Sequence, residues 1–459
     1  MVIKSEHITD EEMAAINQLL GVLKKKTTRN KIRQRYYDGK LTVKNLNIAL
    51  PPKLAAMSRS TIGWGAKAVN SLAVRSRFDG FVYKGLEEDP LADVIRDNNF
   101  YDLYRQATIS ELTNSCAFIT ISAGEEDEPP VVFNFYAATK AAATWNAREK
   151  RIKNGVVITA GEPSLPDGFI FYTNDAIIEC KKETLEWNVE RTDHDYGRPL
   201  MEALVYNPSL EKPFGTSRIS RAVMSIIDRA LRTIVRMDIA AEFFTAPQKY
   251  LLGADKDVLD GKSKFDTYID SIFGATKDEE GDTPAYGQLP QGQLTPLTDQ
   301  FRALAAEFSG ETSIPVSSLG IIHDNPASAE GIYATKEDLI MVAENLNTTN
   351  GNALRNIGML ALMILSGKPS ANELPEAWKS IMPKFKSPAR PSVVSQSDAI
   401  IKQVSAIPWI AETDVALEEL GYSEDQIIRM KAQQIDADAA TTFLEMAGNL
   451  NEATNTDGS

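Results

Sequence analysis

The sequence is poor in cysteine and histidine, and this scarcity excludes several kinds of site. Cys116 and Cys180 are the two cysteines among 459 residues, too few for a disulfide framework and not in the spacing of a metal site. The three histidines, His7, His194 and His323, are scattered along the chain. General acid-base chemistry needs a positioned partner, which this spacing does not supply. We therefore predict no metal and no cofactor, and a reducing compartment.

A long apolar run is also missing. The longest, Met359 to Leu365, is far shorter than the roughly 20 residues that span a bilayer. The first residues, MVIKSEHITDEEM, contain no apolar core of a signal peptide. These features are typical of a soluble cytoplasmic chain without a membrane partner.

The chain has no excess of positive charge. Its 49 Lys and Arg residues are outnumbered by 63 Asp and Glu residues, which gives a net charge of −14. Phosphate binding needs clustered cations that release counterions. Nonspecific capture of nucleic acid by the whole surface is therefore excluded, and any contact with nucleic acid must be local or repulsive.

What remains is a globular composition, 43% hydrophobic and 24% charged, with a length that allows two to four domains. Capping residues and apolar periodicity predict helices over 10–24, 28–37, 64–74 and 100–113, and a strand over 78–83. From Cys116 to Tyr206 the pattern changes to short β-rich runs separated by turn residues. These predict strands over 116–122, 129–136, 155–161, 168–173, 175–180, 184–190 and 202–208. The predicted fold class is α+β.

The longest uninterrupted helical pattern of the first half runs from Pro213 to Pro247. Gly215, Thr216 and Ser217 supply turn and capping chemistry, and Pro247 ends the helix. One face is basic and is formed by Arg218, Arg221, Arg229, Arg232 and Arg236. The opposite face is apolar and is formed by Ile219, Val223, Ile226, Ile227, Ala230, Ile234 and Met237. An ordinary surface helix with solvated arginines explains this pattern, and so does a rod that joins two bodies or lines a ring.

After Pro247 the chain predicts a small inserted lobe. It contains a short strand at Lys249 to Leu252, a short helix near 265–273 and an acidic run rich in Gly and Pro. Thr298 or Thr295 is the predicted N-cap of a second helix, which Pro315 ends. The layout is a helix out, a small lobe and a helix back.

A loop over 316–327 follows, and it leads into a very long helix. Asn325 is the predicted N-cap and Pro326 the first helical residue of a stretch that reaches Leu365, with possible bends at Gly351 and Gly358. Pro369 and the residues 383–391 predict a linker. The part from Gln396 on is helical and becomes strongly acidic, and its last ten residues have a disordered composition.

No catalytic motif stands out. Gly63 to Lys67 only superficially resembles a phosphate-binding loop, because it lacks the four-residue spacer and the Lys-Ser/Thr pair. We therefore predict no catalytic residue. A nucleotidyl or phosphoryl transferase with an unrecognised carboxylate site stays open as an alternative, as does a non-viral ring or scaffold component.

The order of several short motifs resembles that of tailed-bacteriophage portal proteins, the head-tail connectors of long-tailed phages of Gram-positive hosts. Each motif is weak alone, none is catalytic, and together they cover nearly the whole chain. They lie at 32–39 (IRQRYYDG), 64–75, 80–81, 213–221 (PFGTSRISR), 246–253 (APQKYLLG), 325–332 (NPASAEGI) and 417–427.

The resemblance implies a portal architecture and a division of the chain. It implies an α/β wing over 1–217, a stem helix over 218–245, a small α/β clip over 246–297 and a second stem helix over 298–314. A tunnel loop over 315–327 would follow, then a long helix with the rest of the wing over 328–396 and a helical crown over 397–459. The tunnel-loop residues implied as functional are Gly320, Ile321, Ile322, His323, Asp324, Asn325 and Pro326.

The resemblance also implies the function and the partners. Portal subunits form a ring, usually a dodecamer, at one capsid vertex, and double-stranded DNA passes through its tunnel during packaging and ejection. The implied partners are the terminase large subunit, the major capsid or scaffolding protein and a head-completion adaptor. The implied location is the virion, after assembly in the host cytoplasm. The basic face of the stem helix would contact neighbouring subunits or DNA, and we expect Asp299 and Glu307 as partners of its arginines.

Overall fold

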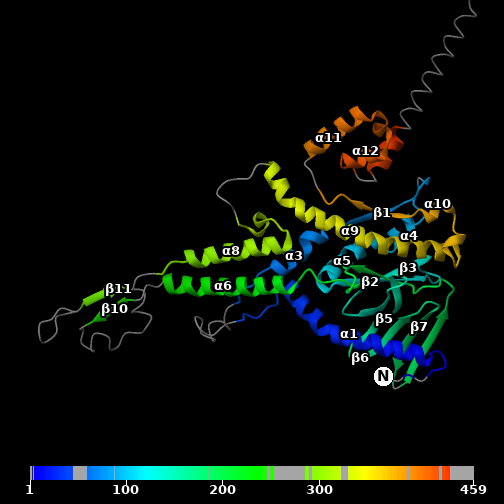
Figure 1. Ribbon diagram of the computed structural model, residues 1–459, viewed down its shortest axis with the longest axis horizontal. Helices are drawn as coiled ribbons and strands as arrows, with labels where there is room; N and C mark the ends of the chain where they lie inside the picture. Colours follow the sequence, from blue (N-terminus) through cyan, green and yellow to red (C-terminus); the bar gives the residue numbers. More distant parts are fainter. Residues whose placement is uncertain are drawn as a thin grey trace, which may run out of the picture. The chain divides into compact units, whose positions relative to one another are not determined.

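The computed structural model describes most of the chain in two compact units, residues 1–388 and 389–459. The described residues are 3, 5–44, 59–86, 88–184, 186–245, 249–252, 285–288, 292–321, 329–389, 393–422 and 426–434. The fold is α+β, as predicted, with helices and antiparallel sheets alternating along the first unit (Figure 1). Within the described ranges, no helix combines the length and apolar character that crossing a bilayer requires.

The chain begins with one long helix, α1 (Asp10–Tyr37), where the sequence predicted two. The predicted break near Lys24 to Thr28 is wrong, because this stretch contains neither Gly nor Pro. The Thr27 hydroxyl also donates to the Leu23 carbonyl, 2.7 Å away, within the helix. Apolar residues on one side of α1 pack on a five-stranded sheet, with Ile16, Leu19 and Leu23 almost fully buried.

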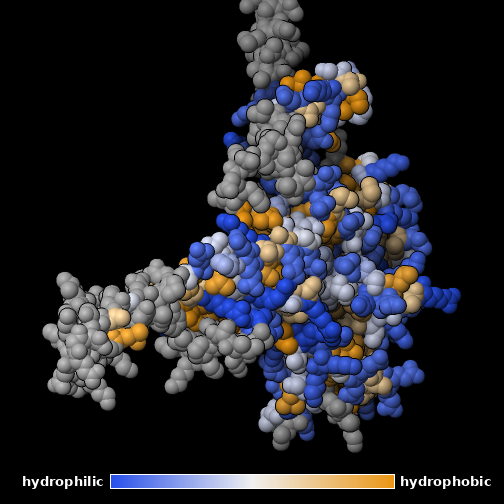
Figure 2. Space-filling model, turned by 60° about the vertical axis from the view of Figure 1, so that its left-hand side comes forward, coloured by the Kyte–Doolittle hydropathy of each residue, from blue (hydrophilic) through white to orange (hydrophobic). Residues whose placement is uncertain are grey.

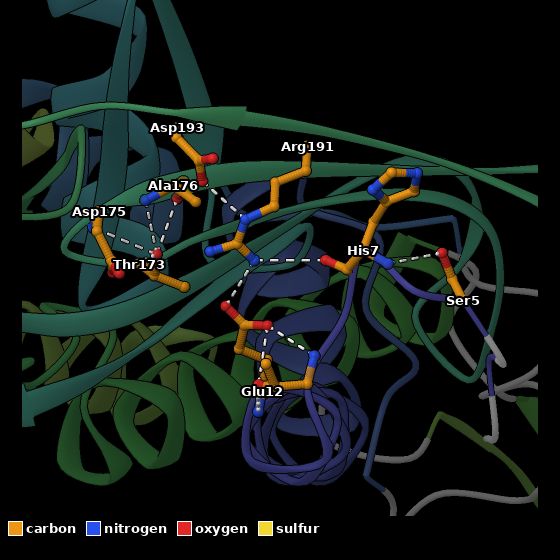
Figure 3. Close-up of polar contacts among 9 residues, drawn as sticks. Ser5, His7, Glu12, Thr173, Asp175, Ala176, Arg191 and Asp193 are labelled. Atoms are coloured by element: carbon orange, nitrogen blue, oxygen red, sulfur yellow. Dashed lines mark hydrogen bonds and ion pairs between the residues drawn. The ribbon is translucent and has the colours of Figure 1, made fainter.

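The start of α1 is fixed to that sheet by Arg191. Its guanidinium donates to Glu12 Oε1 at 3.0 Å, to the His7 carbonyl at 3.3 Å and to Asp193 Oδ1 at 2.7 Å (Figure 3). Glu12 closes a capping box with Thr9 at the same time. Partial burial on its own raises the pKa of the Glu12 carboxyl, but the hydrogen bonds from Thr9 and Arg191 lower it overall. A charged Glu12 therefore joins the first turn of α1 to strand β8 (Glu186–Asp193).

The five-stranded sheet is an antiparallel meander in the order β4-β5-β6-β7-β8. Its strands are β4 (Ala141–Asn146), β5 (Arg151–Glu162), β6 (Leu165–Tyr172), β7 (Ala176–Glu183) and β8 (Glu186–Asp193). Strand β4 was not predicted, because its sequence AAATWN is rich in alanine, which has low strand propensity. It forms by pairing along β5, so the neighbouring strand overrides the local preference.

A second sheet has three antiparallel strands in the order β3-β2-β9. These are β2 (Cys116–Ala123), β3 (Val131–Ala137) and β9 (Met201–Val205), and each was predicted. The first six residues of β2 are all buried, so both faces of this central strand are covered. Helix α5 (Phe100–Asn114) and the long helix α9 (Ala329–Ser366) pack against this sheet in the largest core of the unit.

Helix α9 is continuous through Gly351 and Gly358, the two positions where the sequence suggested a bend. A Cβ at Gly358 would lie 2.7 Å from Ile381 Cδ1 and 2.8 Å from Phe81 Cζ, closer than real Cβ contacts, so this position needs glycine for packing. The segment that crosses there is a strand, β12 (Met382–Lys386), which pairs antiparallel with β1 (Arg77–Val82). The prediction of a linker beginning at Pro383 is therefore wrong, because this proline is tolerated in a short two-stranded sheet.

The other elements of the first unit are shorter or paired helices. They are α3 (Trp64–Ala73), α4 (Ala92–Asp97), α6 (Arg221–Thr245), α8 (Thr295–Thr312), the 3₁₀ turns Val316–Leu319 and Ala371–Glu373, α10 (Glu376–Lys379) and the strand pair β10 (Lys249–Leu252) and β11 (Ala285–Gln288). The second unit contains α11 (Val393–Ala406), a 3₁₀ turn at Pro408–Glu412 and α12 (Asp414–Glu419), in agreement with the predicted helical end of the chain. The predicted helix near 265–273 and the last ten residues lie outside the described residues.

A buried polar network joins α5 to α9 inside the largest core. Asn350 of α9 donates to Glu111 Oε2 of α5 at 2.9 Å and to the Tyr104 hydroxyl at 3.3 Å, and that hydroxyl lies 2.9 Å from Ser76 Oγ. Glu111 is fully buried, and burial raises the pKa of its carboxyl to about 8, although the Asn350 hydrogen bond lowers it. The carboxyl is therefore protonated at neutral pH in the folded protein.

This network predicts a pH-dependent stability. The unfolded Glu111 ionises near its ordinary pKa while the folded one keeps its proton, so Glu111 lowers stability progressively as pH rises from about 4.5 to about 8. Glu111→Gln cannot ionise, so we expect the variant to unfold at a higher temperature than the wild type at pH 8 and at a similar temperature at pH 5. The difference at pH 8 should be a few kcal/mol, since one pKa unit corresponds to about 1.4 kcal/mol.

Thermal unfolding followed by circular dichroism at several pH values measures this difference. Asp102→Asn is a suitable control on the same helix, because this exposed acid lies outside the network. Parallel wild-type and Glu111→Gln curves between pH 5 and pH 8 would contradict the raised pKa.

Candidate site on the paired helices

Helices α6 and α8 lie side by side and run in opposite directions (Figure 1). At one end Ser220 Oγ donates to Glu311 Oε1 at 3.3 Å, and at the other the Phe244 ring lies against Gly292. The predicted arrangement of a helix out and a helix back is therefore present.

The apolar side of α6 is buried, largely as predicted. Ile219, Val223, Ile226, Ile227 and Ala230 are at most 2% exposed, whereas Ile234 and Met237 are only half-buried. Leu231 and Val235 are buried in addition. This core also contains residues of α3, α8 and α9.

Aromatic contacts fix the second helix in the same core. The Trp64 ring of α3 lies 5.3 Å from the Phe301 ring and 4.9 Å from the Phe308 ring, both on α8. Aromatic pairs at this separation contribute roughly 0.5–1.5 kcal/mol beyond their buried area. The base of the helix pair is thus a packed part of the first unit.

Both helices begin at residues other than the predicted ones. Helix α6 starts at Arg221, and Ser220 is its cap, because Ser220 Oγ accepts the Val223 N–H at 3.1 Å. The hydroxyl of Ser217 instead donates to the Thr113 carbonyl at 2.6 Å. Helix α8 starts at Thr295 without a side-chain cap, and Thr298 donates back to the Thr295 carbonyl inside the helix.

Arg218 does not belong to the predicted basic face. It precedes α6, is 7% exposed, and its guanidinium donates to the Ala68 carbonyl at 2.6 Å, the Thr312 carbonyl at 2.5 Å and the Tyr206 hydroxyl at 3.0 Å. These acceptors come from α3, from the end of α8 and from the segment that follows β9. A single buried cation therefore ties both helices of the pair to the sheet region.

The other four arginines lie on α6. Arg221 is exposed, and Arg229, Arg232 and Arg236 are half-buried. Arg229 forms an ion pair with Glu307 of α8, which was one of its two predicted partners. The other, Asp299, lies 3.8 Å from Arg302 of its own helix. The hydrophilic surface around the helix pair is visible as blue in Figure 2.

An acid on α6 that the sequence did not single out joins this helix to the end of α1. Asp228 accepts a hydrogen bond from the Tyr36 hydroxyl at 2.8 Å and forms an ion pair with Lys44. The hydrogen bond with Asp228 raises the pKa of the Lys44 ammonium, which therefore stays charged. The sequence signal was available, since acids are few on α6, which contains only Asp228, Asp238 and Glu242.

The predicted loop after α8 is described only in its first part. Val316–Leu319 forms a 3₁₀ turn, and Gly320 ends it with a positive φ of 82°, which suits glycine. Ile321 is half-buried and packs against the core at the base of the helix pair. The predicted residues Ile322, His323, Asp324, Asn325 and Pro326 lie outside the described residues, and so does the predicted cap of α9.

The chemistry of the described residues is that of packing and ion pairing. No group of three or more His, Cys, Asp or Glu side chains in the described part of the chain could hold a metal ion. Cys116 and Cys180 are free and buried.

Comparison with known proteins finds two similar phage proteins. No family model matches the chain. The chain is 23% identical over 433 residues to the portal protein of Mycobacterium phage L5, covering 91% of this chain and 87% of that protein. It is 22% identical over 466 residues to the portal protein of Mycobacterium phage D29, covering 98% of this chain and 93% of that protein. The chain is thus similar to phage portal proteins along nearly its whole length.

The chain also matches solved structures from gene transfer agent particles. The neck of the native particle, computed with C12 symmetry, matches this chain with a TM-score of 0.43 and 12% identity, covering 78% of this chain and 91% of that one. The neck of the empty particle, computed with C6 symmetry, matches with a TM-score of 0.45 and 13% identity, covering 75% and 86%.

The buried position of Arg218 predicts unequal effects of two neighbouring arginines. Arg218→Met removes three hydrogen bonds and leaves buried acceptors without a donor, so we expect a loss of roughly 2–4 kcal/mol in the free energy of unfolding. Arg221→Met, an identical change at an exposed position, should change it by less than about 0.5 kcal/mol. Urea denaturation of the subunit measures both, and equal effects would show that Arg218 does not tie the helices.

Proposed function

We propose that this chain is a portal protein, which assembles into a closed ring of about twelve subunits at one capsid vertex. Double-stranded DNA would pass through the ring during packaging and ejection. The observation that supports this proposal is the similarity to two phage portal proteins along nearly the whole chain, including the helix pair and the segments on either side.

We assign the parts of the chain as follows. Residues 1–217 form the wing, α6 and α8 the two-helix stem, 246–297 the clip and 315–327 the tunnel loop. The long helix α9 returns to the wing within 328–396, and 397–459 form the crown. The packing of α6 and α8 on each other and on α3 supports a rigid stem, and the strand pair β10 and β11 between them supports a clip.

The stem arginines serve mainly in protein contacts under this proposal. Arg218 is buried within the subunit and Arg229 pairs with Glu307, so two of the five predicted basic residues are already engaged. Arg221, Arg232 and Arg236 remain for neighbouring subunits or for the tunnel. A chain with a net charge of −14 offers DNA a surface with little attraction, which suits translocation because phosphate contacts must be released.

The proposed partners follow from the same role. They are the terminase large subunit, a head-completion adaptor and the major capsid or scaffolding protein. The protein would reside in the virion after assembly in the host cytoplasm. The ring would hydrolyse nothing itself, so the ATPase would be the separate motor. An enzyme acting through a carboxylate site, or a non-viral ring, are the competing functions that the next experiment separates.

The ring is tested by the mass and shape of the purified full-length chain. We expect native mass spectrometry and negative-stain images to give closed rings of about twelve subunits, either as purified or at high protein concentration. The reason is that the exposed apolar residues of a free subunit would be covered in the ring. A chain that stays monomeric at tens of milligrams per millilitre would contradict the proposal, and robust ATP hydrolysis by purified rings would favour the enzyme.

The tunnel loop is tested by shortening it outside the part that packs on the core. Because Ile321 contacts the core and is kept, deletion of Ile322 to Asp324 should leave ring assembly intact and reduce DNA packaging. A control variant with these three residues replaced by Gly-Ser-Gly keeps the length and removes the side chains. Normal packaging by the deletion variant would identify the segment as a plain connector between α8 and α9.

A further inference from the structure

A separate pocket in the wing lies between α1, strand β4 and the segment that leads into α6. Its volume is about 400 Å³, which is within the usual range for small-molecule sites. Its cationic residues are Lys26, Arg29 and Arg33 of α1, together with Lys212 from the segment before α6. Glu211 is the one acid in its lining.

The three α1 cations share a helical face because they are three and four residues apart. Farther toward the N-terminus this side of the helix is apolar, with Leu19 and Leu23 buried. Beyond Leu23 the side that meets the sheets turns polar, where Asn30 is 4% exposed and donates to the Ala138 carbonyl at 3.3 Å. The helix thus covers an apolar core in its first half and a cationic cavity in its second.

The positive charge of the pocket is not neutralised within the subunit. Lys26, Arg29, Arg33 and Lys212 form no ion pair with any residue in the described ranges. Burial, together with the charge of Arg29, lowers the pKa of the Arg33 guanidinium to about 10, so it stays charged at neutral pH in a place that disfavours charge. A buried cation without an anion is costly, and an oxyanion in the pocket would remove that cost.

Two buried polar atoms at the pocket also lack a partner among the described residues. One is Arg33 Nε, a donor, since this guanidinium uses NH1 for the Asn114 carbonyl at 3.2 Å and Asn30 Oδ1 at 3.4 Å. The other is Oδ1 of Asn114, an acceptor, whose residue is 3% exposed. A ligand with both an oxyanion and a hydroxyl group would satisfy both atoms.

The remaining walls are apolar and leave room. Ala141, Ala142 and Ala143 of β4 line one side, and their small side chains keep the space open. Phe214 lines another side, and its ring is half-buried. The centroid of this ring lies 6.1 Å from that of Phe118 and 6.0 Å from that of Trp145. An aromatic or aliphatic group can therefore pack there, next to the cations.

The loop that carries Phe214 is held firmly. Gly215 has a φ of 65°, and a Cβ there would lie 2.1 Å from the Tyr206 carbonyl oxygen, so the backbone approaches the end of β9 in a way only glycine allows. Gly215 N–H donates to the Lys212 carbonyl at 2.8 Å. The wall of the pocket is thus formed before any ligand arrives.

We propose that this pocket binds a small organic phosphate. The phosphate lies among Arg33, Arg29 and Lys26, and the apolar part of the ligand packs against Phe214 and the alanines of β4. Guanidinium groups suit phosphate because their donors match its oxygens in pairs. The pocket is much larger than a single oxyanion, so the organic part contributes to binding.

Isothermal titration calorimetry of the full-length protein tests this, with adenosine 5′-monophosphate (AMP), adenosine and inorganic phosphate as probes. We expect AMP to bind at least tenfold more tightly than adenosine or phosphate, and its affinity to fall as salt rises. Arg29→Gln, at an exposed position that lines the pocket, should weaken AMP binding roughly tenfold. Ala143→Leu, which fills space without changing charge, should weaken it as well.

Lys25→Gln is the matched control, because Lys25 is an exposed cation of the same helix outside the pocket lining. It should leave AMP binding unchanged. Absence of AMP binding at millimolar concentration would overturn the proposal, and so would equal binding of AMP and adenosine. Equal weakening of AMP binding by Lys25→Gln and Arg29→Gln would show nonspecific attraction to α1 and overturn the proposal. Unchanged AMP binding by the Ala143→Leu variant would overturn it too.

Discussion

The orientation of the helix pair depends on one buried guanidinium. The Arg218 guanidinium donates hydrogen bonds to α3, to the end of α8 and to Tyr206. These three acceptors come from distant parts of the sequence. Packing alone allows two helices to slide or rotate by small amounts, whereas hydrogen bonds to a planar cation fix direction as well as distance. The apolar core around Trp64 and Phe308 contributes the buried area that stabilises the helix pair, and Arg218 fixes the orientation of the two helices.

Helix α9 extends this constraint to the rest of the first unit. Leu339, Ala343 and Leu346 belong to the core of the helix pair, whereas Leu354, Ile357 and Leu360 belong to the core of the sheets. One continuous helix therefore contacts both cores, and a displacement at one end is resisted by packing at the other. The buried Asn350 lies between these two stretches and specifies, through Glu111, which turn of α9 faces α5.

Sequence reasoning predicted the fold class, most strands and the apolar face of α6, because these depend on periodicity within single elements. It failed where a neighbour decided the outcome. Alanine-rich β4 exists through its pairing with β5, and β12 exists through its pairing with β1, so neither is visible in local propensity. Arg218 fits the helical spacing of the basic face, but the helix begins three residues later and turns this side chain inward. The pocket was missed because the cations of α1 are about 100 residues or more from the alanines of β4 and from Phe214 in the chain.

The pairing of β1 with β12 also orders events in time. Phe78 faces Phe385 across this small sheet, and the paired helices α6 and α8 and both larger sheets lie between them in the sequence. At roughly 5–20 residues per second, the ribosome releases β12 some tens of seconds after β1 has been made. Until then β1 has no partner strand, so the subunit cannot complete the largest core, to which Phe78 and Ile381 both belong. A nascent chain consequently reaches a form able to join other subunits only when synthesis of the first unit is finished, which delays assembly until each copy is whole.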